Sequence, residues 1–114
     1  MIYLSDHGDD ADKHLGHESS KFTYRMAHIP LIMLFSESFM QNRRELYETL
    51  KSHKDSYWTN DLLYNVMVNI LGVQGIPNSE PALDLGNEKY GGSADILMTL
   101  HGRKRISEDP SVKN

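Results

Sequence analysis

The stretch IYLSDHGDD, residues 2–10, determines which fold and which chemistry we expect. It begins as a short apolar run typical of a buried strand and ends in an acid, a histidine and a glycine. Neighbouring side chains of a strand point to opposite faces, so Asp6 and His7 can share a metal ion only where the strand turns, and Gly8 supplies that turn. Carboxylate and neutral imidazole are ordinary zinc ligands. We therefore predict a metal site at the carboxyl end of this strand, where open α/β sheets usually bind ligands.

A catalytic zinc ion needs three protein ligands and an open position, so Asp6 and His7 alone are not enough. His14 and His17 lie in the polar loop that follows and could add a ligand or form a second site. The alternative is that the histidines of this loop are ordinary surface residues. The other histidines are isolated in the sequence and are expected to be structural or solvent-facing: His28, His53 and His101.

The composition limits the possible classes of protein. A chain of 114 residues, 39% hydrophobic and 25% charged, can form one modest core. A net charge of −4 with scattered basic residues argues against a nucleic-acid partner, which needs a clustered basic face. The absence of cysteine excludes disulfides, thiolate zinc ligands and cysteine nucleophiles in these residues. No apolar stretch approaches the roughly 18 residues that span a bilayer, so we expect this chain to be soluble.

Hydrophobic periodicity and turn residues predict a mixed order of strands and helices. Ser36 and Thr59 are expected helix caps, and Gly72 is an expected helix end. An apolar stripe on the second helix is expected to be buried: Trp58, Leu62, Val66 and Ile70. The expected strands are 2–5, 29–36 and 95–102, the helices are 37–52 and 58–72, the loops are 6–28 and 73–94, and the disordered tail is 107–114.

This order favours an α/β fold. The continuous apolar character of 29–36 is typical of a strand in a sheet that is covered on both faces. Three strands are few for such a sheet. We therefore predict that residues 1–106 are the C-terminal part of a larger α/β domain, with a mixed sheet covered by helices.

The chain resembles a known family over residues 2–106, nearly its whole length. YLSDHGDD…HLGHESSKFTYRMAHIPLIMLFS is similar to the C-terminal catalytic segment of sulfatase-like enzymes of the alkaline phosphatase superfamily, and most similar to bacterial phosphoethanolamine transferases. The shared features are the strand ending in Ser-Asp-His-Gly at residues 5–8, the later Gly16-His17 pair, and the Pro-Leu-Ile pattern at residues 30–32. TNDLLYNVMVNILGV and DILMTLHGRKRI resemble the later helix and closing strand of the family. Asp9 stands where the family more often has glutamate.

The resemblance implies roles for particular residues. Asp6 and His7 would bind the catalytic zinc ion, and His17 would bind a second zinc ion or the transferred phosphate. Lys21 and Tyr24 lie near the positions of substrate-contacting residues, although their spacing is shorter than in sulfatases. No catalytic nucleophile is expected in this chain, because the family's threonine lies upstream on another helix.

The resemblance also implies an activity and a location. The parent enzyme would transfer phosphoethanolamine from a phospholipid donor to a cell-envelope glycan or lipid. It would be held in the bacterial inner membrane by N-terminal helices, with a periplasmic catalytic domain. The isolated chain is expected to be inactive and, with two ligands, to bind zinc weakly or not at all.

Two alternatives remain open. The first is a sulfatase or phosphodiesterase of the same superfamily, distinguished by the upstream nucleophile. The second is a non-catalytic module that associates with itself, since the exposed strand edges of a truncated sheet invite pairing between copies.

Overall fold

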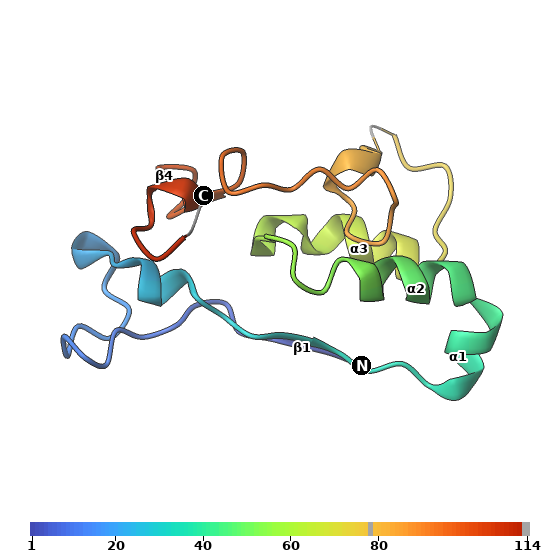
Figure 1. The fold of residues 1–114 in the computed structure, drawn as a ribbon, viewed down its shortest axis with the longest axis horizontal. Helices are drawn as coiled ribbons and strands as arrows, with labels where there is room; N and C mark the ends of the chain where they lie inside the picture. The colour runs from blue at the N-terminus through green and yellow to red at the C-terminus, as the bar shows by residue number, and fades with distance from the viewer. Residues whose placement is uncertain (78, 113–114) are drawn as a thin grey trace. The chain divides into compact units, whose positions relative to one another are not determined.

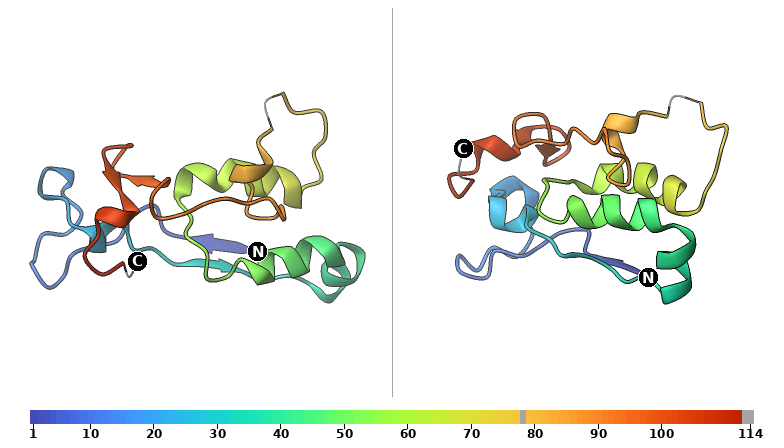
Figure 2. Two further views of the ribbon diagram at one scale, coloured as in Figure 1. Left: turned by 45° about the horizontal axis from the view of Figure 1, so that its top comes forward. Right: turned by 45° about the vertical axis from the view of Figure 1, so that its right-hand side comes forward.

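The computed structural model describes residues 1–77 and 79–112, which form two compact units. The strand unit contains residues 1–35 and the segment that starts at Met98, and the helical unit contains Ser36–Leu97. The fold is mixed α/β, with small antiparallel sheets and short helices (Figures 1 and 2). Among the described residues, no helix is long and apolar enough to cross a lipid bilayer.

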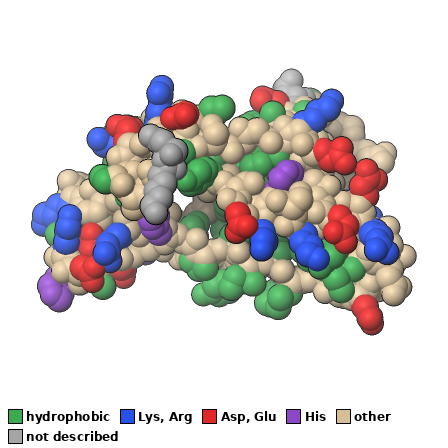
Figure 3. Space-filling view, viewed as in Figure 1, with side chains coloured by type: hydrophobic (Ala, Val, Ile, Leu, Met, Phe, Trp, Pro, Cys, Tyr) green, Lys and Arg blue, Asp and Glu red, His purple; other side chains and the backbone are tan. Residues whose placement is uncertain are grey.

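The first sheet is a ribbon of two antiparallel strands, β1 (Ile2–Leu4) and β2 (Leu31–Met33). Tyr3 lies directly opposite Ile32, and these side chains remain 56% and 48% exposed. Directly opposite residues share one face of the ribbon, so that face is apolar and open to solvent, and Figure 3 shows hydrophobic side chains at the surface there. The expected mixed sheet covered by helices is therefore absent from the described residues, whose named strands pair in two-stranded antiparallel sheets.

The second sheet is a small hairpin formed by β3 (Met98–Thr99) and β4 (Lys104–Arg105). The predicted strand 95–102 is wrong, because the chain reverses within it. Leu100, His101 and Gly102 have φ angles of 48°, 53° and 77°, in the left-handed region that turns use. Two of these residues are not glycine, so turn composition alone does not reveal the reversal.

The segment predicted as a disordered tail is ordered through residue 112, and residues 113 and 114 lie outside the described residues. A short 3₁₀ helix, Ile106–Glu108, is followed by Asp109, which is only 6% exposed. The Asp109 carboxylate accepts hydrogen bonds from the Ser111 backbone N–H at 2.9 Å and hydroxyl at 2.8 Å, and its other oxygen lies 3.0 Å from His28 Nε2. The contact with His28 joins the C-terminal segment to the chain just before β2.

Asp109 should make the strand unit sensitive to acid. Burial would raise the pKa of this carboxyl, but the hydrogen bonds from Ser111 and His28 outweigh it and lower the pKa below 3.8. A lowered folded-state pKa means that the ionised group stabilises the fold fully above the unfolded value, near pH 4, and that this contribution is lost as pH falls through the folded value.

Asp109→Asn removes this contribution. The variant should melt at a lower temperature than wild type, as measured by circular dichroism. The difference in Tm should be largest at about pH 6 and should shrink towards about pH 2. The control is Asp95→Asn, at an exposed position of the helical unit, and it should show no such trend. An Asp109→Asn deficit that stays constant across this range would contradict the assignment.

The helical unit begins with two helices, α1 (Glu37–Asn42) and α2 (Arg44–Ser52), where one continuous helix was predicted. Ser36 caps α1 as predicted, because its hydroxyl oxygen accepts a hydrogen bond from the Phe39 N–H at 3.1 Å. The helix breaks at Arg43 (φ −124°, ψ 44°), whose guanidinium donates to the carbonyl oxygens of Asn69 at 3.0 Å and Ile70 at 3.3 Å. These carbonyls belong to the last turn of the next helix, where the usual partner four residues later is missing.

That next helix, α3, spans Leu63–Ile70 and follows a 3₁₀ turn at Asn60–Leu62, so it is shorter than predicted. Gly72 follows its end with φ 69°, and its N–H donates to Asn69 O at 3.0 Å, as expected of a helix-ending glycine. Thr59 was predicted to cap this helix, but its side chain makes no capping hydrogen bond and its hydroxyl is buried without a hydrogen-bond partner.

The core of the helical unit forms mainly between α2, α3 and the chain after residue 80. Asp84 joins α3 to this later segment, because it accepts hydrogen bonds from the Asn69 side chain at 2.7 Å and the Gly86 N–H at 2.8 Å. Leu62 and Val66 are buried as predicted, whereas Trp58 and Ile70 are only partly buried. The buried apolar residues of this unit are Leu46, Leu50, Leu62, Val66, Leu85 and Leu97.

Candidate metal centre

The end of β1 is held against the segment 24–28 by a close backbone contact. The Gly8 N–H donates to Met26 O at 2.7 Å, and a Cβ placed on Gly8 would lie 2.9 Å from Arg25 O and 3.0 Å from His28 O. Glycine is thus needed at position 8 because the backbone there lies close to the backbone of segment 24–28. The sequence predicted a glycine-specific turn at this position, and the structure gives the glycine a different reason.

Gly8→Ala should destabilise the protein by about 1–3 kcal/mol, because the added methyl group must push two backbone segments apart. A matched control is Gly91→Ala, since the nearest atoms to a Cβ there lie at ordinary contact distances of 3.9 and 4.0 Å. Chemical denaturation of both variants measures the difference. Equal stability of Gly8→Ala and Gly91→Ala would contradict the close-contact explanation.

The loop after Gly8 is closed by Asp10, which is 1% exposed. Its backbone N–H donates to Gly16 O at 2.9 Å, forming an isolated antiparallel bridge. Its carboxylate accepts from the Thr23 hydroxyl at 2.6 Å and the Lys13 N–H at 3.1 Å. The hydrogen bond from Thr23 is the main reason that the pKa of Asp10 is lowered. The Asp10–Gly16 bridge brings the residues beside it, Asp9 and His17, onto adjacent chain segments.

Three side chains meet at this point, and we call them the His7–Asp9–His17 cluster. Asp9 Oδ1 lies 3.1 Å from His17 Nδ1 and 3.9 Å from His7 Nδ1. The two imidazole rings are stacked with centroids 4.1 Å apart and planes inclined by 26°. One ligand atom from each residue lies within 4.8 Å of the others, and all three side chains are exposed.

The cluster fits the chemistry of zinc. Tetrahedral zinc with bonds of about 2.0–2.1 Å places its ligand atoms about 3.4 Å apart, so small side-chain movements would bring these three atoms to ligand geometry. Imidazole and carboxylate donors suit zinc, and three protein ligands leave one position open. The residues present therefore fit a catalytic type of zinc site.

The structure brings some of the predicted metal ligands into the cluster and leaves others outside it. Asp6 lies beside His7, with Asp6 Oδ1 3.7 Å from His7 Nε2, close to the separation of about 3.4 Å between two ligands of one zinc ion. The three-residue cluster nevertheless contains Asp9 and not Asp6. His7 and Asp9 are two positions apart, and in extended chain such residues point to the same side. That spacing could have identified Asp9 from the sequence. His14, with φ 52°, lies outside the cluster.

Lys21 and Tyr24, the predicted substrate contacts, make structural contacts in the strand unit. The Lys21 ammonium lies 3.2 Å from the Glu18 carboxylate. The Tyr24 hydroxyl donates to Arg105 O at 3.0 Å and so joins the loop to β4. Burial raises the pKa of Tyr24, and Glu108 and Asp109 add to this effect.

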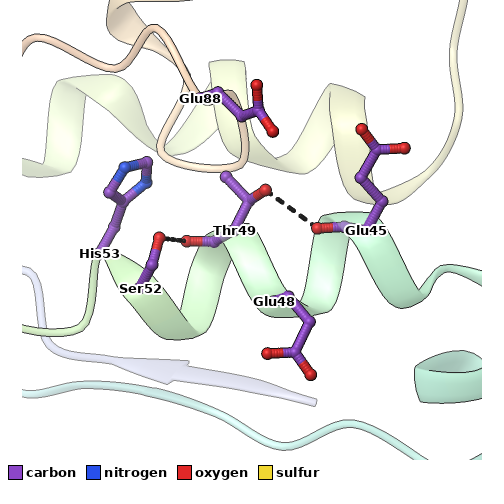
Figure 4. A pocket seen from close by; sticks show the side chains of 6 residues that line it. All are labelled: Glu45, Glu48, Thr49, Ser52, His53 and Glu88. Carbon is purple, nitrogen blue, oxygen red and sulfur yellow. Dashed lines mark hydrogen bonds between the residues drawn. The ribbon is translucent and has the colours of Figure 1, made fainter.

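The helical unit contains a separate open groove of about 340 Å³ (Figure 4). Its glutamate carboxylates point in different directions, and Glu48 points away from Glu88. His53 is half-buried, with Nδ1 2.8 Å from Leu85 O, which gives this histidine a structural contact. The residues lining the groove are Glu45, Glu48, Thr49, Ser52, His53 and Glu88.

Comparison with known proteins returns no family model, no curated protein and no solved structure that matches this chain.

Proposed function

We propose that this chain carries zinc ligands of a sulfatase-like enzyme of the alkaline phosphatase superfamily. The observation that carries the proposal is the His7–Asp9–His17 cluster at the end of β1. The order Ser-Asp-His-Gly followed by Gly-His, which resembles that family, supplies two of its three members. The proposed activity is transfer of phosphoethanolamine from a phospholipid to a cell-envelope glycan or lipid, by a periplasmic catalytic domain of an inner-membrane protein.

The residues have distinct tasks in this proposal. His7 and His17 bind zinc through neutral imidazole nitrogens, and Asp9 contributes a carboxylate oxygen. Bound zinc supplies positive charge to the phosphoryl oxygens, where negative charge develops during transfer. Asp6 lies 3.7 Å from His7 and orients that ring or reaches a second ion. Lys21 would contact substrate only after it leaves Glu18.

The nucleophile of this proposal is a threonine of the parent enzyme, outside this chain. The experiment therefore uses the protein expressed from the complete reading frame, with a chromogenic phosphodiester and a phosphatidylethanolamine donor as substrates. His7→Ala and His17→Ala should each lower turnover by more than about 100-fold, since outer contacts alone are worth 10–100-fold. The control is His101→Asn. His101 is an exposed residue of the same unit, and asparagine tolerates the left-handed backbone conformation found there.

The outcomes separate the alternatives. Phosphodiester turnover that survives in His7→Ala would overturn the proposal. Hydrolysis of sulfate esters in place of phosphodiesters would identify the sulfatase branch of the superfamily. The purified 114-residue chain should show no turnover with either substrate.

A second candidate function, a self-associating module, rests on the apolar face of the β1–β2 ribbon. Tyr3, Ile32 and Leu34 on this ribbon and its end are 56%, 48% and 57% exposed. A ribbon of two strands is marginally stable unless such a face is covered. Analytical ultracentrifugation should then show dimers or larger species that Ile32→Lys dissociates. A monomeric wild-type chain at high concentration would exclude this function.

A further inference from the structure

Asp10 is a buried acid that no step of the proposed reaction uses. It is 1% exposed, and aspartate is almost never buried to this extent without partners. Its two carboxylate oxygens are divided between two elements of the loop. One accepts from the Lys13 N–H inside the 10–16 turn, and the other accepts from Thr23, thirteen residues along the chain.

This division ties the turn to the segment that precedes β2. Inside the turn, the Leu15 N–H also donates to Asp10 O at 3.2 Å, and the Asp10 N–H donates to Gly16 O at 2.9 Å. Asp10 thus uses its N–H, its carbonyl and its carboxylate to hold both ends of the same turn. The side chains of residues 11–14 are exposed, and among them Asp12 also joins the turn to this segment through an ion pair with Arg25. Both members of that pair are more than 60% exposed, and such surface pairs contribute little compared with the buried Asp10.

The two ends of this turn carry two members of the metal cluster. Asp9 precedes Asp10, and His17 follows Gly16, so the Asp10–Gly16 bridge sets the separation between Asp9 Oδ1 and His17 Nδ1, 3.1 Å. A turn free to open would have to be ordered each time metal binds, and ordering exposed chain weakens binding.

We propose that Asp10, held by Thr23, is the positioning residue of the zinc site: it preorganises Asp9 and His17 for the metal. This inference rests on the part of the proposed function that has the His7–Asp9–His17 cluster bind zinc. It assigns Asp10 no contact with metal or substrate.

The test compares three variants of the chain. Thr23→Val removes the hydroxyl with little change of volume, Thr23→Ser keeps the hydroxyl, and Asp10→Asn replaces one acceptor oxygen by an amide. Zinc affinity is measured by calorimetry, and the approach of the His7 and His17 rings in metal-free protein is measured by nuclear Overhauser contacts. Ala11→Ser, at an exposed position of the same turn, is the control.

Thr23→Val and Asp10→Asn should weaken zinc binding by about 10–100-fold, the range for contacts that orient ligands, while Thr23→Ser and Ala11→Ser stay near wild type. A merely structural role would lower Tm and leave the zinc affinity of the folded protein unchanged, and that result overturns the proposal. If Asp10→Asn does not fold, the comparison of zinc affinity between Thr23→Val and Thr23→Ser tests the proposal.

The two proposals can fail separately. If the wild-type chain binds no zinc, the proposed function fails, and the ring contact in metal-free protein still tests Asp10. Loss of the His7–His17 contact in Thr23→Val, with retention in Thr23→Ser, supports positioning by Asp10. Retention of that contact in both variants overturns it.

Discussion

Leu62→Ala is expected to lower the free energy of unfolding of the helical unit by about 2–5 kcal/mol. Leu62 is 4% exposed and lies at the start of α3, one turn before Val66, which is fully buried. Truncation removes apolar contacts and leaves a cavity that the neighbouring helix cannot fill without moving. Denaturant unfolding followed by the fluorescence of Trp58, the single tryptophan, reports on this unit directly.

A solvent-facing leucine provides the matched control for this result. Leu71 follows the end of α3 and is 67% exposed, so Leu71→Ala should change stability by less than about 0.5 kcal/mol. Ile70, expected to be fully buried from its spacing, is partly exposed, and Ile70→Ala should fall between the two. A Leu62→Ala loss below about 1 kcal/mol would mean that α3 does not present Leu62 to the core.

His7→Ala is expected to weaken metal binding by more than about 100-fold, because it removes a direct ligand and outer contacts alone are worth 10–100-fold. His7 also stacks on His17, so its loss leaves the second ring held by Asp9 Oδ1, 3.1 Å from His17 Nδ1, without the stacking contact. Cobalt is a suitable probe, since its visible absorption depends on ligand number and geometry. The spectrum of tetrahedral cobalt should appear with wild type and His101→Asn and should be absent with His7→Ala. Identical spectra for all three proteins would place the metal elsewhere.

The fold could be predicted from the sequence where local signals were strong. The Ser36 cap and the Gly72 helix end depend on contacts within a few residues, and both were correctly predicted. The break at Arg43 could not be predicted, because its cause is a contact with carbonyls 26 and 27 residues away. The solvent exposure of the ribbon face was not predicted, for a related reason. An apolar run indicates that a strand can be covered by other elements, but it does not show that such elements are present.

The candidate site shows the same limit. Asp6 and His7 attract attention because they are adjacent at the end of a strand, and the resemblance adds His17. His17 meets Asp9 because the Asp10–Gly16 bridge folds the loop back, and the Asp10 carboxylate accepts a hydrogen bond from the distant Thr23 hydroxyl. The sequence therefore identified the region of the site, with His7 from its place at the strand end and His17 from the resemblance. It missed Asp9, although the position of Asp9 two residues after His7 was a usable signal.

Zinc titration of the 114-residue chain by calorimetry, with Asp9→Asn and Asp6→Asn in parallel, tests the three-ligand cluster most directly. Two ligands would bind weakly or not at all, whereas His7, Asp9 and His17 together should bind one zinc ion per chain with measurable affinity. Asp9→Asn should weaken that binding by more than about 100-fold, and Asp6→Asn by about tenfold or less. Absence of binding, or binding that depends on Asp6 and not on Asp9, would contradict the proposed metal centre.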